Sequence, residues 1–185
     1  MRWRENGVID MPKPRKMLSD WNAPYIQSLV KLIETQSKTT LANWCISYAE
    51  ENILPVYEKH CPNDGRPQNA LKAGCKWLDG EIKLPQAKAV ILDCHAAARQ
   101  LEDNPTAQAA ARAIGQCTSV IHSASHCLGL AYYGALAVAY DKLGVNTPWA
   151  ELEALAAEEC GRMEAALRAS AIENEPNPAK FTWQC

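Results

Sequence analysis

The chain lacks several features that would place it in a membrane-bound or nucleic-acid-binding class. No uninterrupted run of about 20 apolar residues occurs, so no membrane-spanning helix is expected. Positive charge is not in excess: 19 lysines and arginines stand against 21 aspartates and glutamates, so no surplus neutralises nucleic-acid phosphates. Strand-like β-branched alternation is also nearly missing. With 48% hydrophobic and 22% charged residues among 185, the composition predicts one soluble globular domain.

Motifs of the common enzyme classes are missing too. The glycines are isolated, so neither a phosphate-binding loop nor a dinucleotide fingerprint is present, and no Gly-x-Ser-x-Gly elbow occurs. None of the eight cysteines forms a Cys-x-x-Cys pair, which argues against zinc-ribbon and thioredoxin sites. We therefore predict no catalytic residue and no cofactor from motifs alone.

The first residues predict a cytoplasmic protein. They lead into no apolar core and no small-residue cleavage site, so a secretory signal is not expected. Disulfides are rare without export, and most cysteines fall in helical apolar stripes. We expect them to be buried free thiols that pack as small hydrophobic residues.

Prolines mark the two ends of the chain. Residues 1–20 are basic and contain Met11-Pro-Lys-Pro-Arg-Lys, which predicts an extended tail because proline disfavours helices and central strands. Met11 is an alternative to Met1 as the translation start. Residues 174–185 begin with Asn174-Glu-Pro-Asn-Pro and are expected to form a C-terminal tail that contains Phe181 and Trp183. Residues 21–173 then form one helical domain.

Apolar residues recur at helical spacing through that domain. A stripe starting at Tyr25 predicts the first helix, and residues 39–60 predict a second that Pro55 must kink or interrupt. Further helices should begin at the prolines 67, 85, 105 and 148, where a missing N–H costs nothing. A rod from 105 to 143 would be about 58 Å long, too long for a domain with a radius of gyration of about 16 Å. A break is therefore expected near Ser123-Ala-Ser125, with a serine capping the next helix.

The fold expected from these patterns is all-α. Alanine is frequent in the central helices, where it favours helix and allows helices to approach closely. We predict a single-domain bundle or array of six to eight helices with an alanine-rich core and no significant sheet. Tyr132, Tyr133 and the six tryptophans are expected to pack in this core rather than to form stacking platforms.

Two histidines suggest a metal site. His122 and His126 are four residues apart, so one continuous helix would place both imidazoles on the same face, a spacing that suits a metal. Against this, Ser123 stands where a metalloprotease has glutamate, and the expected break would separate the pair. Histidines hydrogen-bonded between packed helices are the alternative interpretation.

A second candidate group lies around Asp93-Cys94-His95. His95 and Arg99 are one helical turn apart and share a face. Asp93 is two positions from His95, so the two cannot face each other on one helix. The alternative interpretation is a charged helix rim in water.

Several runs together resemble a bacterial all-helical family. In chain order they are Trp21-Asn-Ala-Pro-Tyr25, Trp44-Cys-Ile-Ser-Tyr-Ala-Glu50, Asp64-Gly-Arg-Pro67, His95-Ala-Ala-Ala-Arg99, Ala109-Ala-Ala-Arg-Ala-Ile-Gly115, His122-Ser-Ala-Ser-His126 and Tyr132-Tyr133. The sequence is similar here to the immunity-protein-like domains linked to polymorphic toxin systems. The similarity spans about residues 21–144, with nothing recognised in the final helix. Ser125 departs from the family pattern, which has an acidic residue before the second histidine.

The resemblance implies a cytoplasmic antidote that binds a cognate toxin without catalysis. Its partner-binding or ligand-binding candidates are the charged and imidazole residues in the matching motifs: Arg66, His95, Arg99, His122 and His126. Such a task needs a rigid complementary surface of about 800 Å² per partner.

Three further hypotheses stay open. A histidine-based, metal-dependent enzyme would use His95, His122 and His126 as metal ligands. A small-ligand-binding protein would instead use a pocket formed where the candidate residues of different helices converge. A redox or ligand sensor would need an exposed cysteine with a lowered pKa. The alanine-rich helices are also compatible with a homodimer.

Overall fold

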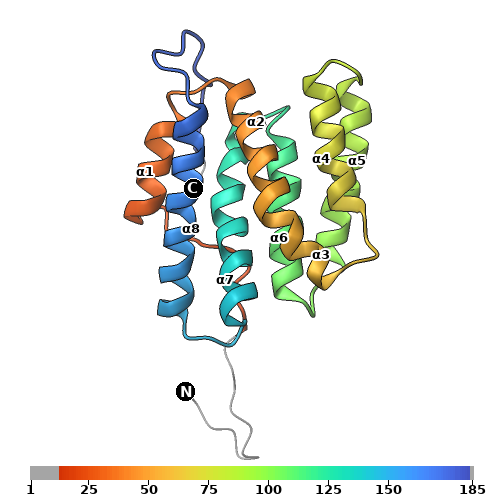
Figure 1. The fold of residues 1–185 in the computed structure, drawn as a ribbon, viewed down its shortest axis with the longest axis vertical. Helices are drawn as coiled ribbons and strands as arrows, with labels where there is room; N and C mark the ends of the chain where they lie inside the picture. The colour runs from red at the N-terminus through yellow and green to blue at the C-terminus, as the bar shows by residue number, and fades with distance from the viewer. Residues whose placement is uncertain (1–12, 184–185) are drawn as a thin grey trace, which may run out of the picture.

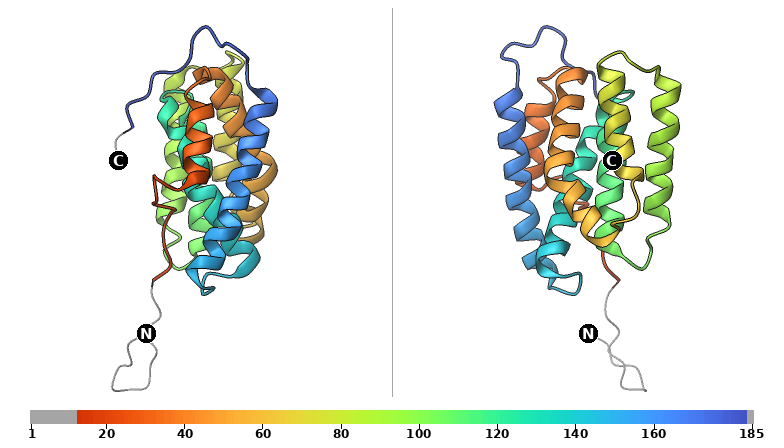
Figure 2. Two further views of the ribbon diagram at one scale, coloured as in Figure 1. Left: turned by 90° about the vertical axis from the view of Figure 1, so that its left-hand side faces the viewer. Right: turned by 45° about the vertical axis from the view of Figure 1, so that its right-hand side comes forward.

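The computed structural model describes residues 13–183 and is all-α over that range (Figure 1). No strand occurs among these residues, so the predicted all-α array with no sheet is confirmed. The helices are α1 (Pro24–Ile33), α2 (Lys38–Tyr48), α3 (Leu54–His60), α4 (Arg66–Leu78), α5 (Leu84–Arg99), α6 (Pro105–Ser119), α7 (Ala135–Leu143) and α8 (Trp149–Ser170). They run up and down along the long axis of the molecule (Figure 2).

Pro55 interrupts the predicted helix 39–60, as its geometry requires. The chain forms α2, then a π-helical turn at Ala49–Ile53, then α3 with Pro55 in its first turn. The widened turn lies just before the proline, where the Leu54 N–H donates to the Ala49 carbonyl five residues back. One rod thus continues with a local defect instead of ending.

Helix α6 lies at the centre of the array and explains the abundance of alanine. It packs against α3, α4, α5 and α7, and most of its residues are buried. A helix surrounded on several sides can approach its neighbours only if its side chains are small. The run Ala109–Ala111 supplies such small side chains on faces that contact different helices.

The predicted break after α6 is present. The chain leaves α6 at Ser119, forms a 3₁₀ turn at Ala124–Cys127 and a π-helical turn at Leu130–Gly134, and continues as α7. The expected serine cap is wrong in detail. Ser123 precedes the 3₁₀ turn, but its hydroxyl lies 3.1 Å from the Ser125 hydroxyl and caps no backbone N–H. The break folds the chain back so that α6 and α7 lie side by side.

The segments that flank the helices at both ends lie against the bundle. In residues 13–23, Leu18 is buried, and its N–H donates to the Tyr132 carbonyl at 2.9 Å. In residues 171–183, the Ala179 N–H donates to the Gln36 carbonyl at 2.9 Å. Residues of both segments line the surface pocket of the candidate site.

Candidate functional site

The structure brings three of the five candidate residues together. His95 lies on α5, His122 in the turn after α6 and His126 in the 3₁₀ turn. The rings of His122 and His126 lie 5.2 Å apart, edge to face, and His95 interacts electrostatically with both. We refer to these three residues as the histidine cluster.

Gly115 makes room for the His95 imidazole. A Cβ at Gly115 would lie 2.6 Å from Cε1 and 2.7 Å from Nδ1 of His95, so only glycine lets the ring rest on α6. Ser119 Oγ donates its one proton to the Gly115 carbonyl at 2.7 Å. It can therefore only accept from His95 Nε2, at a long 3.5 Å, which places the His95 proton on Nε2.

His126 is fixed by Gln116. Its Nδ1–H donates to Gln116 Oε1 at 2.6 Å. Gln116 lies directly over Gly129, where any Cβ would overlap the Gln116 side chain. Gly129 therefore supports His126 indirectly, as Gly115 supports His95 directly.

His122 holds the unsatisfied atom of the cluster. Its Nδ1 is buried and has no hydrogen-bond partner within residues 13–183. A buried polar atom without a partner costs about 1–3 kcal/mol.

Burial keeps the cluster uncharged near neutral pH. It is the main cause that lowers the pKa of each of the three histidines. The neighbouring histidines and the cations Lys38 and Lys88 lower the pKa of His122 further, and Arg99 does the same for His95. The charged groups that act on the cluster are therefore cations, a setting that favours contact with negative charge.

The metal alternative finds no support in this geometry. Across the described part of the chain, no group of three or more His, Cys, Asp or Glu side chains is arranged to hold a metal ion. The three imidazoles are neighbours without converging on a common point.

Arg66 lies away from the cluster. It begins α4, forms a bidentate ion pair with Asp64 and donates to Gln100 Oε1 at 2.9 Å, next to the start of α6. The hydrogen bonds from Arg66 lower the pKa of Asp64 to about 2. Because His122 follows the other end of α6, about 20 Å of helix separates Arg66 from His122, whereas His95 lies on α5 shortly before Gln100, the residue that Arg66 contacts. Arg99 is exposed on α5, one turn from His95.

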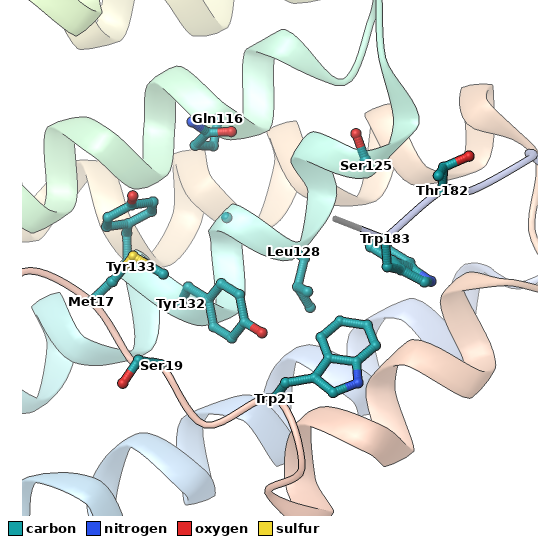
Figure 3. Close-up of a pocket in the computed structure, with 11 residues that line it drawn as sticks. Met17, Ser19, Trp21, Gln116, Ser125, Leu128, Tyr132, Tyr133, Thr182 and Trp183 are labelled. Carbon is teal, nitrogen blue, oxygen red and sulfur yellow. The ribbon is translucent and has the colours of Figure 1, made fainter. Parts of the chain in front are cut away.

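An aromatic pocket beside the cluster was missed by the sequence reasoning (Figure 3). It has a volume of about 660 Å³ and combines half-buried rings with a rim of small polar side chains. It is lined by Met17, Ser19, Trp21, Gln116, Ser125, Leu128, Gly129, Tyr132, Tyr133, Thr182 and Trp183. Gln116 and Ser125 connect it to the histidine cluster. The aromatic residues that line this pocket pack against the core, as expected, but each leaves part of its ring exposed.

The cysteines do not provide the site that a thiol sensor requires. Burial raises the pKa of Cys45, Cys61, Cys75, Cys94, Cys127 and Cys160. Cys61 and Cys75 are partly accessible, but a raised pKa reduces the reactive thiolate fraction. Cys185 lies outside the described residues.

The fold and the site define an all-α protein with a neutral histidine cluster next to an aromatic surface pocket. Comparison with known families now gives the particular class. A family model described as Imm-5 like putative immunity protein matches residues 31–166, most of the chain, and the protein therefore belongs to this family. The match includes most of α8, so the expectation that the final helix lies outside the resemblance is wrong.

No curated protein and no solved structure matches the chain. Over the described residues, the helices are too short or too polar for any of them to traverse a lipid bilayer.

Proposed function

We propose that this protein is a bacterial antidote that binds a cognate toxin in the cytoplasm and blocks it without catalysis. The observation that carries the proposal is its membership of the immunity protein family over residues 31–166. A tightly packed helical array supports it, because a preformed surface loses little entropy on binding.

The histidine cluster and Arg99 are the proposed centre of the toxin-binding surface. The three imidazoles are partly exposed, one buried nitrogen lacks a partner among the described residues, and the charges acting on them are cations. A partner surface that carries carboxylates would pair with these cations, and its own N–H or O–H donors could bond the ring nitrogens that carry no proton.

Arg66 belongs to the outer part of this proposed surface. An interface of about 800 Å² per partner extends about 15 Å from its centre, which is enough to reach Arg66 because Arg66 contacts Gln100, the residue after Arg99. Because its guanidinium is already held by Asp64 and Gln100, Arg66 would offer a fixed rim charge rather than a central contact. Rim charges affect mainly the association rate.

Co-expression with the toxin encoded by a neighbouring gene tests the proposal. Cells producing the toxin should survive when this protein is present, and the two proteins should elute together as a stable complex. Loss of toxicity without any complex would contradict binding as the mechanism. If mass spectrometry shows that the mass of the toxin is unchanged, covalent modification of the toxin by this protein is excluded.

A further inference from the structure

The aromatic pocket offers ring surface that residues 13–183 leave partly uncovered. Trp21 and Trp183 meet at 5.5 Å with their planes tilted by 51°, and Phe181 stacks behind Trp183 at 4.6 Å. Tyr132 and Trp21 face the same space in Figure 3. All these rings are half-buried, so a guest ring would gain both apolar burial and aromatic contacts.

The pocket opens at the surface, which favours a side chain of a partner protein as its occupant over a free small molecule. Ser19, Ser125 and Thr182 line it and are exposed. A small-molecule site usually buries most of its ligand, whereas an interface pocket takes one anchor and leaves its rim to be covered by the rest of the partner.

Arg112 provides a positive charge that would favour a carboxylate next to the side chain inserted by the partner. It is half-buried, and its guanidinium lies 5.8 Å from the centre of the Tyr133 ring at the pocket wall. No carboxylate pairs with it within residues 13–183. A partly desolvated guanidinium is well suited to bidentate pairing with a carboxylate.

The other charges near the pocket are of both signs. Lys16, next to the lining residue Met17, is exposed and has no ion-pair partner in the described range. The two nearby carboxylates, Asp20 and Glu34, accept hydrogen bonds from the Asn22 N–H and from Trp183 Nε1, and both keep their negative charge. Arg112 is the half-buried cation beside the pocket, and it is therefore the charge that a carboxylate of the partner would meet.

We propose that the aromatic pocket receives an aromatic side chain of the toxin, from a segment whose neighbouring carboxylate pairs with Arg112. The inference rests on the proposed function and specifies the chemistry of the partner. Gln116 contributes as well: its Oε1 accepts from His126, and its amide N–H groups, which have no partner within residues 13–183, would donate to a partner carbonyl at the pocket mouth.

Three variants test the proposal with the full-length protein and its toxin. Thr182→Trp fills the pocket from an exposed lining position and should weaken toxin binding by at least tenfold. Arg112→Met keeps the aliphatic stem but removes the charge and should weaken it about tenfold, as expected for a central interface residue. Ser28→Trp adds the same indole at an exposed position of α1 that does not line the pocket and should change affinity by less than twofold.

A peptide probe tests the pocket independently of the toxin. N-acetyl-Asp-Trp-amide should shift the NMR indole signals of Trp21 and Trp183, and the shifts should be lost in Thr182→Trp. N-acetyl-Ala-Trp-amide should bind more weakly. Equal binding of the two peptides would overturn the role of Arg112 and indicate a general apolar ligand site, and no shift at all would overturn the pocket proposal.

The outcomes separate this inference from the proposed function. If both pocket variants bind the toxin as tightly as the wild type, the pocket proposal fails while the antidote function stands. If the wild-type protein binds no toxin but the acidic peptide occupies the pocket, the antidote function fails, and the pocket's preference for an aromatic group beside a carboxylate stands.

Discussion

Gly115→Ala should destabilise the protein, although alanine is the better helix former. The new Cβ would lie 2.6 Å from His95 Cε1, so the ring must move by about 1 Å to regain an ordinary carbon–carbon distance. Overpacking of this kind costs about 1–3 kcal/mol. Replacing glycine within a helix returns about 1 kcal/mol. The free energy of unfolding should therefore fall by about 0–2 kcal/mol.

A double-mutant cycle separates these two contributions. Once His95→Ala has removed the imidazole, Gly115→Ala should stabilise the protein by about 1 kcal/mol, because only the helix preference remains. The coupling energy between the two positions should then be about 1–3 kcal/mol. Urea denaturation followed by circular dichroism measures all four free energies of unfolding.

Gly161→Ala is the matched control for this cycle. Gly161 lies within α8, and a Cβ there would meet nothing within 4 Å, so the substitution should stabilise the protein by about 1 kcal/mol in either background. If Gly115→Ala stabilises the wild-type protein as much as Gly161→Ala does, His95 does not rest on Gly115, and the described arrangement of the histidine cluster is wrong.

Three further predictions concern the stability and reactivity of the fold. Burial lowers the pKa of the histidine cluster, so the unfolded chain binds more protons below about pH 6.5. The contribution of these neutral histidines to the free energy of unfolding should be fully present above that pH and should fall towards pH 5. Calorimetry should show a smaller fall when all three histidines are replaced by glutamine. An equal fall would refute the burial of the histidine cluster as its cause. Tyr48→Phe removes a 2.7 Å hydrogen bond to the buried Glu159 carboxylate and should lower the free energy of unfolding in chemical denaturation by about 1.5–3 kcal/mol. Tyr25→Phe, which removes a longer hydrogen bond to Glu153, should lower it by less than about 1 kcal/mol, and equal losses would contradict the stronger bond at Glu159. In iodoacetamide labelling followed by peptide mass spectrometry, Cys61 and Cys75 should react slowly, and the buried cysteines should react only after unfolding. Rapid labelling of a buried thiol in the folded protein would contradict the described packing of the core.

The helices could be predicted because their boundary signals are local. Pro67, Pro85 and Pro105 each fall in the first turn of a helix, where proline's fixed backbone angle is already helical. The interruption at Pro55 and the break before α7 follow from backbone geometry and from the limit that domain size places on helix length. These signals need no knowledge of which helices meet.

The site could be predicted only in part, because it depends on which helices meet. His95 and Gly115 are brought into contact by the packing of α5 against α6, which no local pattern specifies. The aromatic pocket needs Trp21 and Trp183, which lie near opposite ends of the chain. The motifs contained Trp21 and Tyr132, but their spacing gave no indication that both border one cavity.

The affinity of the purified protein for its cognate toxin tests the central claim most directly. Isothermal titration calorimetry should give a one-to-one complex with a submicromolar dissociation constant, weakened at least tenfold when the three cluster histidines are replaced by alanine. Absence of binding by the correctly folded wild-type protein would contradict the account.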